Sequence, residues 1–220
     1  MAARQGIDLR SHPVIRLYDY VLSGSCYKIR MMLSILGLQH EAIPVDFYPG
    51  RAHKEPDFLD INPLGQLPVL DDGNVRLRDA QAILIYLAAK YDGARVWFPS
   101  DPAAQGEIAM WLSFAGGEIM NASAARLHDM LGYDLDIDNV REAAHDAFRI
   151  LDDHLTMREI EGHGWVATMA RPTIADIACF PYVALAGDGG ISLDDYRAIQ
   201  RWLDRVKAVP GFIPMPGIYL

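Results

Sequence analysis

Two hydroxyls and one thiol lie within four residues in the sequence Ser23-Gly24-Ser25-Cys26. The apolar pattern that follows has the 3.6-residue period of a helix and predicts one at residues 27–36. A serine just before a helix either caps it or donates a hydrogen bond to a charged ligand atom, and both alternatives are open here. Cys26 is in turn either a reactive thiol or a buried residue of the helix.

Asp79 is a second side chain that could act on a ligand. It precedes another helical pattern, at residues 82–91, and aspartate is a favoured N-cap. The open N–H groups at a helix N-terminus also suit an anion. Asp79 therefore either only caps this helix or also contacts a ligand at its start.

The segment in front of Asp79 predicts a β-hairpin that would position it. Apolar runs at residues 67–70 and 75–77 flank Asp72-Gly73, and Asp-Gly between apolar runs is a strong hairpin signal. Pro68 has no N–H to donate, so it belongs at the start or edge of a strand. Only roughly 5–6% of X–Pro bonds are cis, so the base rate favours a trans Leu67–Pro68 bond.

The remaining patterns predict an α/β half followed by an all-helical half. Strands are expected at residues 14–18 and 41–45, which gives the order β-α-β-(α)-β-β-α. From Asp101-Pro102 onward no strand alternation appears, and further helices are expected at 138–158, 177–185 and 196–209. The predicted domains span residues 13–92 and 101–216.

Composition excludes several classes of function. The chain has 220 residues, of which 51% are hydrophobic, and its net charge of -9 argues against nucleic acid as the main partner. Two distant cysteines and seven scattered histidines predict neither a disulfide framework nor a metal site. No apolar run approaches the roughly 20 residues of a membrane span, and no signal-peptide pattern is evident. We therefore expect a cytoplasmic protein without membrane contact.

Several motifs resemble the glutathione transferase family. Gln66-Leu67-Pro68-Val69-Leu70, the acidic Asp79 twelve positions after Leu67, and Ala-Ile-Leu-Ile-Tyr-Leu at 82–87 resemble its glutathione-binding half. Arg-Pro-Thr-Ile-Ala-Asp-Ile-Ala from residue 171 resembles the helix-capping motif of its second half, which is structural. The resemblance implies a thioredoxin-like N-terminal domain and an all-α C-terminal helical bundle.

The resemblance also implies roles in holding glutathione as co-substrate. The Leu67 backbone before Pro68 would pair with the cysteinyl part, and Asp79 with Ala80 would hold the γ-glutamyl end. The family usually has serine where Ala80 stands, so one hydroxyl contact is missing. His53 lies where theta-like members contact the glycine carboxylate of glutathione, and the neighbouring Lys54 could bind the same carboxylate. Gln66 could add an amide contact. The alternative is that His53 and Lys54 are simply solvated residues of a polar loop.

The expected chemistry is ionisation of the glutathione thiol. Lowering a thiol pKa by about two units corresponds to roughly 2.7 kcal/mol, and one hydrogen bond to a charged group supplies about 1.5–3 kcal/mol. Ser23 matches the activating serine of theta-like members and is the preferred hydrogen-bond donor to the sulfur. The resemblance therefore implies a bacterial, theta/nu-like transferase of the serine type. Ser25 is the second choice, or a simple N-cap, and Cys26 matches the active cysteine of beta-class members or is buried.

The implied function is conjugation of the glutathione thiolate to small hydrophobic electrophiles by a homodimer. One alternative is a glutathione-dependent disulfide reductase or peroxidase. Another is a zeta-like isomerase, because the Ser-Ser-Cys motif of the zeta class resembles Gly24-Ser25-Cys26. A third is a non-catalytic binding or regulatory protein, which Ala80 favours.

A second group of residues could line the electrophile pocket or belong to the core. These are Trp111, Phe114, Met120, Arg126 and His128.

Overall fold

The computed structural model describes residues 14–167 and 170–219. The strands are β1 (Ile15–Asp19), β2 (His40–Pro44), β3 (Val69–Asp72) and β4 (Val75–Leu77). The helices are α1 (Gly24–Ile35), α2 (Pro56–Leu59), α3 (Ala80–Tyr91), α4 (Pro102–Gly116), α5 (Met120–Leu131), α6 (Ile137–Ile160), α7 (Ile174–Ala184) and α8 (Arg197–Lys207), with short 3-10 turns η1 (Ala52–Lys54) and η2 (Ala186–Gly189).

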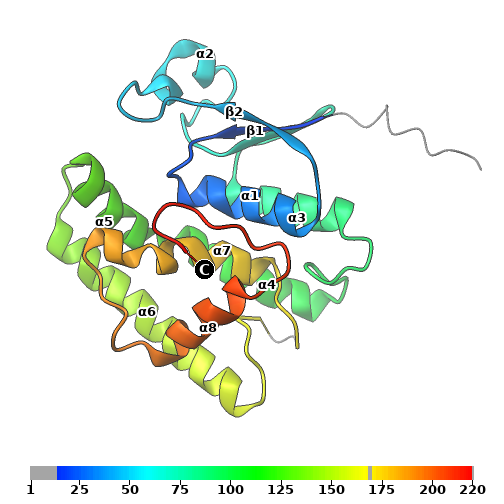
Figure 1. Cartoon of the computed structure of the whole chain (residues 1–220), viewed down its shortest axis with the longest axis vertical. Coiled ribbons are helices and arrows are strands. Elements are labelled where there is room, and N and C mark those ends of the chain that lie inside the picture. Colours follow the sequence, from blue (N-terminus) through cyan, green and yellow to red (C-terminus); the bar gives the residue numbers. More distant parts are fainter. Residues whose placement is uncertain (1–13, 168–169, 220) are drawn as a thin grey trace, which may run out of the picture.

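The four strands form one mixed sheet in the order β2-β1-β3-β4. β1 pairs in parallel with β2, whereas the pairs β1–β3 and β3–β4 are antiparallel. Helices α1 and α3 pack together beneath one face of the sheet, and α2 lies at its far side (Figure 1). This thioredoxin-like arrangement, followed by the helical half, confirms the fold predicted from the sequence.

The hairpin of β3 and β4 is tied to α3 through a buried carboxylate. Asp72 Oδ2 accepts hydrogen bonds from the Tyr86 hydroxyl at 2.8 Å, the Tyr91 hydroxyl at 2.6 Å and Lys90 Nζ at 2.6 Å. These contacts fix the second half of α3 against the end of β3.

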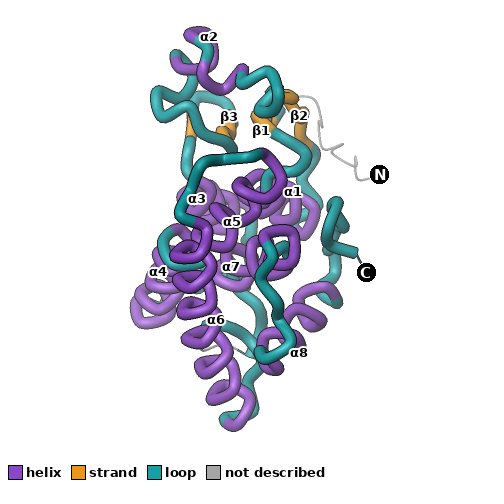
Figure 2. The backbone as a smooth tube through the Cα atoms, turned by 90° about the vertical axis from the view of Figure 1, so that its left-hand side faces the viewer, coloured by secondary structure: helices purple, strands orange, loops and turns teal. Residues whose placement is uncertain are grey.

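Helix α7 forms the centre of the helical half and joins it to the sheet domain. Its side chains from Ile174 to Val183 are buried, and it packs against α4, α8 and also α1 and α3 (Figure 2). A capping box of Thr173 and Asp176 starts the helix. Asp176 also accepts hydrogen bonds from the Val166 backbone and from Trp202 Nε1, both at 2.9 Å. The motif therefore holds the second half together, as a structural motif should.

Helix α1 begins earlier than the sequence pattern predicts. Its first residue is Gly24 instead of Tyr27, because the Ser23 side chain accepts a hydrogen bond from the Cys26 N–H and caps the helix at that point. The interpretation of Ser25 as the N-cap is therefore wrong. Within the described ranges, no helix combines the length and apolar character needed to cross a membrane.

Candidate functional site

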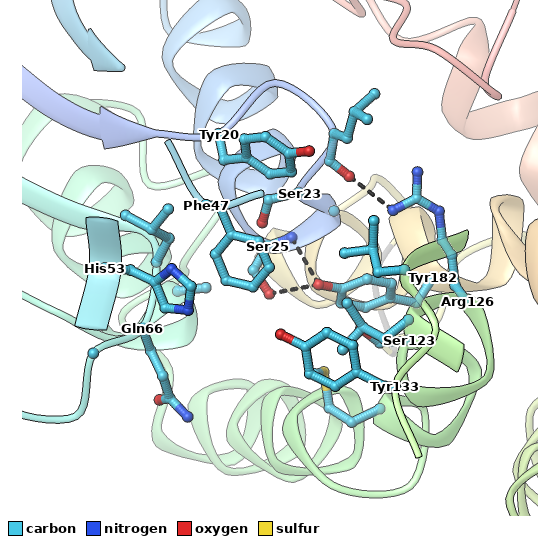
Figure 3. A pocket seen from close by; sticks show the side chains of 18 of the residues that line it. Tyr20, Ser23, Ser25, Phe47, His53, Gln66, Ser123, Arg126, Tyr133 and Tyr182 are labelled. Atoms are coloured by element: carbon cyan, nitrogen blue, oxygen red, sulfur yellow. Dashed lines mark hydrogen bonds between the residues drawn. The ribbon is translucent and has the colours of Figure 1, made fainter. Parts of the chain in front are cut away.

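A cavity of about 460 Å³ lies between the sheet domain and the helical half. The sheet domain contributes the loop before α1, the segment around η1, the turn before Pro68 and the start of α3, while α4, α5 and α7 close the other side (Figure 3). Most of the predicted site residues line this cavity, namely Ser23, Ser25, His53, Lys54, Gln66, Leu67, Asp79 and Ala80. Cys26 and Pro68 do not.

Both serine hydroxyls face the cavity, but they have different partners. The Ser23 Oγ accepts from the Cys26 N–H at 3.2 Å, which leaves its own proton free to donate. The Ser25 N–H donates to the Tyr182 hydroxyl oxygen at 3.0 Å, and the two hydroxyl oxygens are also 3.0 Å apart (Figure 3). Two hydroxyl donors therefore lie at the N-terminal end of α1, where the helix dipole favours negative charge.

Cys26 is fully buried in α1. Burial raises the pKa of its thiol to about 12, and the nearby charge of Asp19 adds to this effect. A reactive cysteine needs an accessible thiolate, which this environment disfavours. The geometry therefore supports the alternative of a buried helix residue over that of a nucleophile.

His53 lines the cavity together with Phe47, against which its ring stacks. The two rings stack with their centroids 4.1 Å apart, and the His53 side chain is almost completely buried. Burial, together with the charges of Lys54 and Arg51, lowers the pKa of His53, so the ring is neutral near pH 7. Its Nδ1 has no hydrogen-bond partner among the described residues, which leaves an unused polar group beside the cavity.

A hydrogen-bonded turn places Leu67 at the wall of the cavity. Buried Asn62 donates to the Gln66 carbonyl at 2.8 Å, and Lys54 Nζ donates to the Gly65 carbonyl at 2.9 Å. Gly65 has a φ of +56°, and a Cβ there would lie 2.7 Å from the His53 carbonyl oxygen. The Leu67–Pro68 bond is cis, contrary to the base-rate expectation.

Asp79 is the N-cap of α3 and also lines the cavity. Its Oδ1 accepts from the Ala82 N–H at 2.8 Å, which leaves the rest of the exposed carboxylate available to a ligand. Ala80, the first residue of α3, is nearly buried and presents no polar side-chain atom. The start of α3 thus offers one carboxylate and open backbone N–H groups.

The helical wall contains two of the five residues considered from sequence for an electrophile pocket. Met120 and Arg126 line the cavity, whereas Trp111, Phe114 and His128 do not. Arg126 Nη1 donates to the Leu22 carbonyl at 2.8 Å, and its Nε donates to Asp188 at 2.9 Å. Arg126 therefore holds the loop that carries Ser23 against the helical half.

Several lining residues were not identified as site residues from the sequence, among them Phe47, Tyr133 and Tyr182. Tyr182 belongs to the apolar run that predicts a buried core helix, and nothing local indicates that its hydroxyl reaches Ser25. Phe47 and Tyr133 lie in connecting segments whose approach to the cavity depends on long-range packing. Such contacts leave no periodic signal in the sequence.

The charges around the cavity favour an anionic ligand. Among the lining residues, Lys54, Arg78 and Arg126 are cationic and Asp79 is the one carboxylate, although the whole chain has a net charge of -9. In the described part of the chain, no group of three histidine, cysteine or acidic side chains is placed to hold a metal ion. The site is therefore suited to a small ligand with at least one negative group and one positive group for Asp79.

Comparison with known proteins identifies relatives of this chain. Residues 22–90 match the family model described as glutathione S-transferase, N-terminal domain. The chain is 30% identical over 206 residues to a maleylacetoacetate isomerase of Pseudomonas aeruginosa, and the match covers 90% of this chain and 93% of the relative.

Solved structures show the same similarity. A glutathione S-transferase from Pseudomonas fluorescens matches with a TM-score of 0.83 and 28% identity, covering 92% of this chain and 98% of the other. A glutathione transferase homolog from Lodderomyces elongisporus, determined with two GSH per subunit, matches with a TM-score of 0.81. At 23% identity, with 90% and 95% of the two chains covered, this second match supports the fold alone.

Proposed function

Since the chain belongs to the glutathione S-transferase family, we propose that it binds glutathione in this cavity and transfers the glutathione thiolate to small hydrophobic electrophiles. The observation that carries the proposal is the convergence, in one cavity, of the serine hydroxyls of α1 and the carboxylate of Asp79. The serine hydroxyls can donate hydrogen bonds to a sulfur anion, and the Asp79 carboxylate can pair with an ammonium group. The theta/nu-like subclass remains a prediction.

The proposed binding mode uses the walls of the sheet domain. The γ-glutamyl ammonium would pair with Asp79, and its carboxylate would meet the open N–H groups at the start of α3. The Leu67 backbone would pair with the cysteinyl part, and His53 with Lys54 would hold the glycine carboxylate. The missing hydroxyl at Ala80 weakens this binding by one contact without removing the site.

The proposed chemical step is attack by the thiolate on a carbon of the electrophile. The new C–S bond forms as the leaving group departs with the bonding electron pair, so glutathione is consumed one for one. Ser23 donates a hydrogen bond to the sulfur anion, and Ser25 is a second donor. One such bond contributes about 1.5–3 kcal/mol, which is the size needed to lower the thiol pKa by about two units.

A second candidate function is glutathione-dependent cis–trans isomerisation. It is favoured by the similarity to a maleylacetoacetate isomerase over 90% of the chain. In such a reaction the thiolate would add to a conjugated double bond, the single bond would rotate, and the thiolate would leave again. Glutathione would then be regenerated, which distinguishes this reaction from conjugation.

One experiment separates these functions. The protein is incubated with glutathione and either an activated chloroarene or a cis-configured conjugated enone, and both glutathione and product are quantified. We expect one glutathione consumed and one halide released for each chloroarene turned over. Isomerised enone with unchanged glutathione would instead establish the second candidate. Bound glutathione without turnover of either compound would contradict both candidate functions.

The homodimer implied by the family resemblance belongs to the same proposal. Exposed apolar side chains on the helical half, such as Met110 at 57% and Ile160 at 74% exposure, are available for contact with a second copy. Light scattering that gives the 24.5 kDa mass of one chain would contradict a dimer.

A further inference from the structure

Lys28 is fully buried in α1, which is unusual for a lysine. Within residues 14–167 and 170–219, its Nζ has no hydrogen-bond partner. Burying an ammonium ion without a partner is costly, and replacing a buried charge with an apolar side chain is often neutral or stabilising. We therefore expect Lys28 to contribute little to stability, and its burial calls for another explanation.

The neighbours of Lys28 place its charge beneath the cavity. Its Nζ lies 5.1 Å from the centroid of the Tyr182 ring, within the range of a cation–π contact. The other charged or titratable neighbours are Cys179 of α7 and Asp79 at the start of α3. Burial raises the pKa of the Cys179 thiol well above its usual range, so Cys179 is neutral and supplies no counter-charge.

Lys28 is charged at neutral pH despite its burial. Burial lowers the pKa of its ammonium group to about 8, while the neighbouring Cys179 and Asp79 act in the opposite direction. At pH 7 the protonated form still predominates. A positive charge therefore lies over the ring of Tyr182 and within electrostatic influence of Asp79, and both of these residues line the cavity.

Tyr182 links this charge to the serine of the site. Ser25 and Lys28 are three positions apart and share one face of α1, and Tyr182 covers that face. A Cβ on Gly24 would lie 2.6 Å from Tyr182 Cε1, so glycine at this position allows the ring to reach Ser25.

The hydrogen bonds of Tyr182 determine the direction in which Ser25 can donate. The Tyr182 oxygen already accepts from the Ser25 N–H, and its single proton is within reach of the Ser25 Oγ, 3.0 Å away. If Tyr182 donates to Ser25, the Ser25 hydroxyl keeps its own proton for an acceptor in the cavity. A cation over the ring strengthens the phenol as a donor, and a chain of such bonds is mutually reinforcing.

We infer that Tyr182 and the buried ammonium group of Lys28 are positioning residues of the thiol site, which hold the Ser25 hydroxyl as a donor to the glutathione thiolate and stabilise that anion from beneath. The inference rests on the proposed function. It assigns a role in thiol ionisation to a residue of the helical half and to a lysine outside the cavity.

The test measures the pKa of the thiol of bound glutathione from the ultraviolet absorbance of the thiolate as a function of pH. Wild type is compared with Tyr182→Phe and Lys28→Met at saturating glutathione, and calorimetry gives Kd for each. The matched controls are Tyr196→Phe, which removes another largely buried tyrosine hydroxyl, bonded to His145, and Lys207→Met on α8. Denaturation in urea reports the stability of every variant.

We expect each of the two variants to raise the thiol pKa by about one unit, with Kd nearly unchanged. Lys28→Met should do so while leaving the protein as stable as wild type or more stable. The controls should leave the thiol pKa unchanged. Should Lys28→Met fail to fold, Lys28→Gln removes the same charge but keeps a polar end and provides the comparison.

The outcomes separate this inference from the proposed function. Wild type that binds no glutathione would overturn the proposed function and the inference together. Wild type that binds it, with the same thiol pKa in all variants, would overturn the inference alone. A changed Kd with an unchanged thiol pKa in the Lys28 variants would mean that Lys28 serves only Asp79, and the inference would be wrong.

Discussion

The hydroxyl oxygen of Tyr182 lies 3.0 Å from both the backbone nitrogen and the Oγ of Ser25, although 157 positions separate the two residues. This contact connects the central helix of the second half to the first turn of α1. The site proposed to ionise glutathione is thus built from both halves of the chain. Its geometry depends on how closely α7 approaches α1.

Gly24→Ala tests that approach directly. The added Cβ would lie 2.6 Å from the Tyr182 ring, so the ring must move and its hydrogen bonds to Ser25 are lost. We expect a loss of about 1–3 kcal/mol in the free energy of unfolding, offset in part by the better helix propensity of alanine, about 1 kcal/mol. Urea denaturation measures the net change.

Gly106→Ala in α4 is the matched control. Apart from the adjoining residues and the backbone of its own helix, nothing in the described part of the chain lies within 4 Å of the added Cβ at this exposed position. This variant should be more stable than wild type by up to about 1 kcal/mol. If Gly24→Ala gained the same stability as Gly106→Ala, the close packing of Tyr182 on α1 would be disproved.

Asp79→Asn should weaken glutathione binding while preserving the helix. Asparagine caps as well as aspartate, but it lacks the charge that would pair with the γ-glutamyl ammonium. A lost charged hydrogen bond of about 1.5–3 kcal/mol corresponds to a Kd that is roughly 10- to 100-fold higher. Asp101→Asn is the control, since Asp101 caps α4 with the same 2.8 Å bond and lies outside the cavity. Equal affinities of the two variants by calorimetry would refute the assigned role.

The parts of this site that local patterns encode were predictable. The hairpin and the N-cap Asp79 were identified because apolar periodicity, Asp-Gly and capping residues act over a few positions, whereas Leu67 was identified from the family resemblance. Of the two readings of Ser25, the N-cap alternative was wrong, since sequence alone does not decide which of two nearby serines caps a helix. The contacts of Tyr182 and Arg126 arise from the docking of two halves, and no local pattern reports them.

Ala80→Ser should strengthen binding. Position 80 starts α3 and lines the cavity, where the resemblance implies a serine hydroxyl in contact with the γ-glutamyl carboxylate. One additional hydrogen bond of about 0.5–1.5 kcal/mol should lower Kd about 2- to 10-fold. Calorimetry that finds weaker or unchanged binding would show that the family's usual contact does not apply in this chain.

Asp72 should make stability depend on pH in the acid range. Burial opposes ionisation, but the hydrogen bonds from Lys90, Tyr91 and Tyr86 outweigh it and hold the pKa of the Asp72 carboxyl below its usual value. Because the folded-state pKa is lowered, the stabilisation is present above the unfolded pKa of about 3.9 and is lost as the pH falls below it.

Asp72→Asn measures this contribution. The variant should be less stable than wild type at pH 7, and the difference should narrow at pH 3, as followed by urea denaturation. Asp71→Asn removes only the neighbouring, more exposed ion pair with Arg76 and should cost less at pH 7. A difference between Asp72→Asn and wild type that is the same at both pH values would contradict the account.

The thiol pKa of bound glutathione in wild type and in the double variant Ser23→Ala/Ser25→Ala tests the central claim most directly. Ultraviolet thiolate absorbance should place the wild-type value about two units below the roughly 8.5 of a free thiol, and each single variant should raise it by about one unit. The double variant should still bind glutathione, with a thiol pKa close to that of the free thiol. A wild-type pKa equal to the free value, or an unchanged pKa in the double variant, would contradict thiol activation by these hydroxyls.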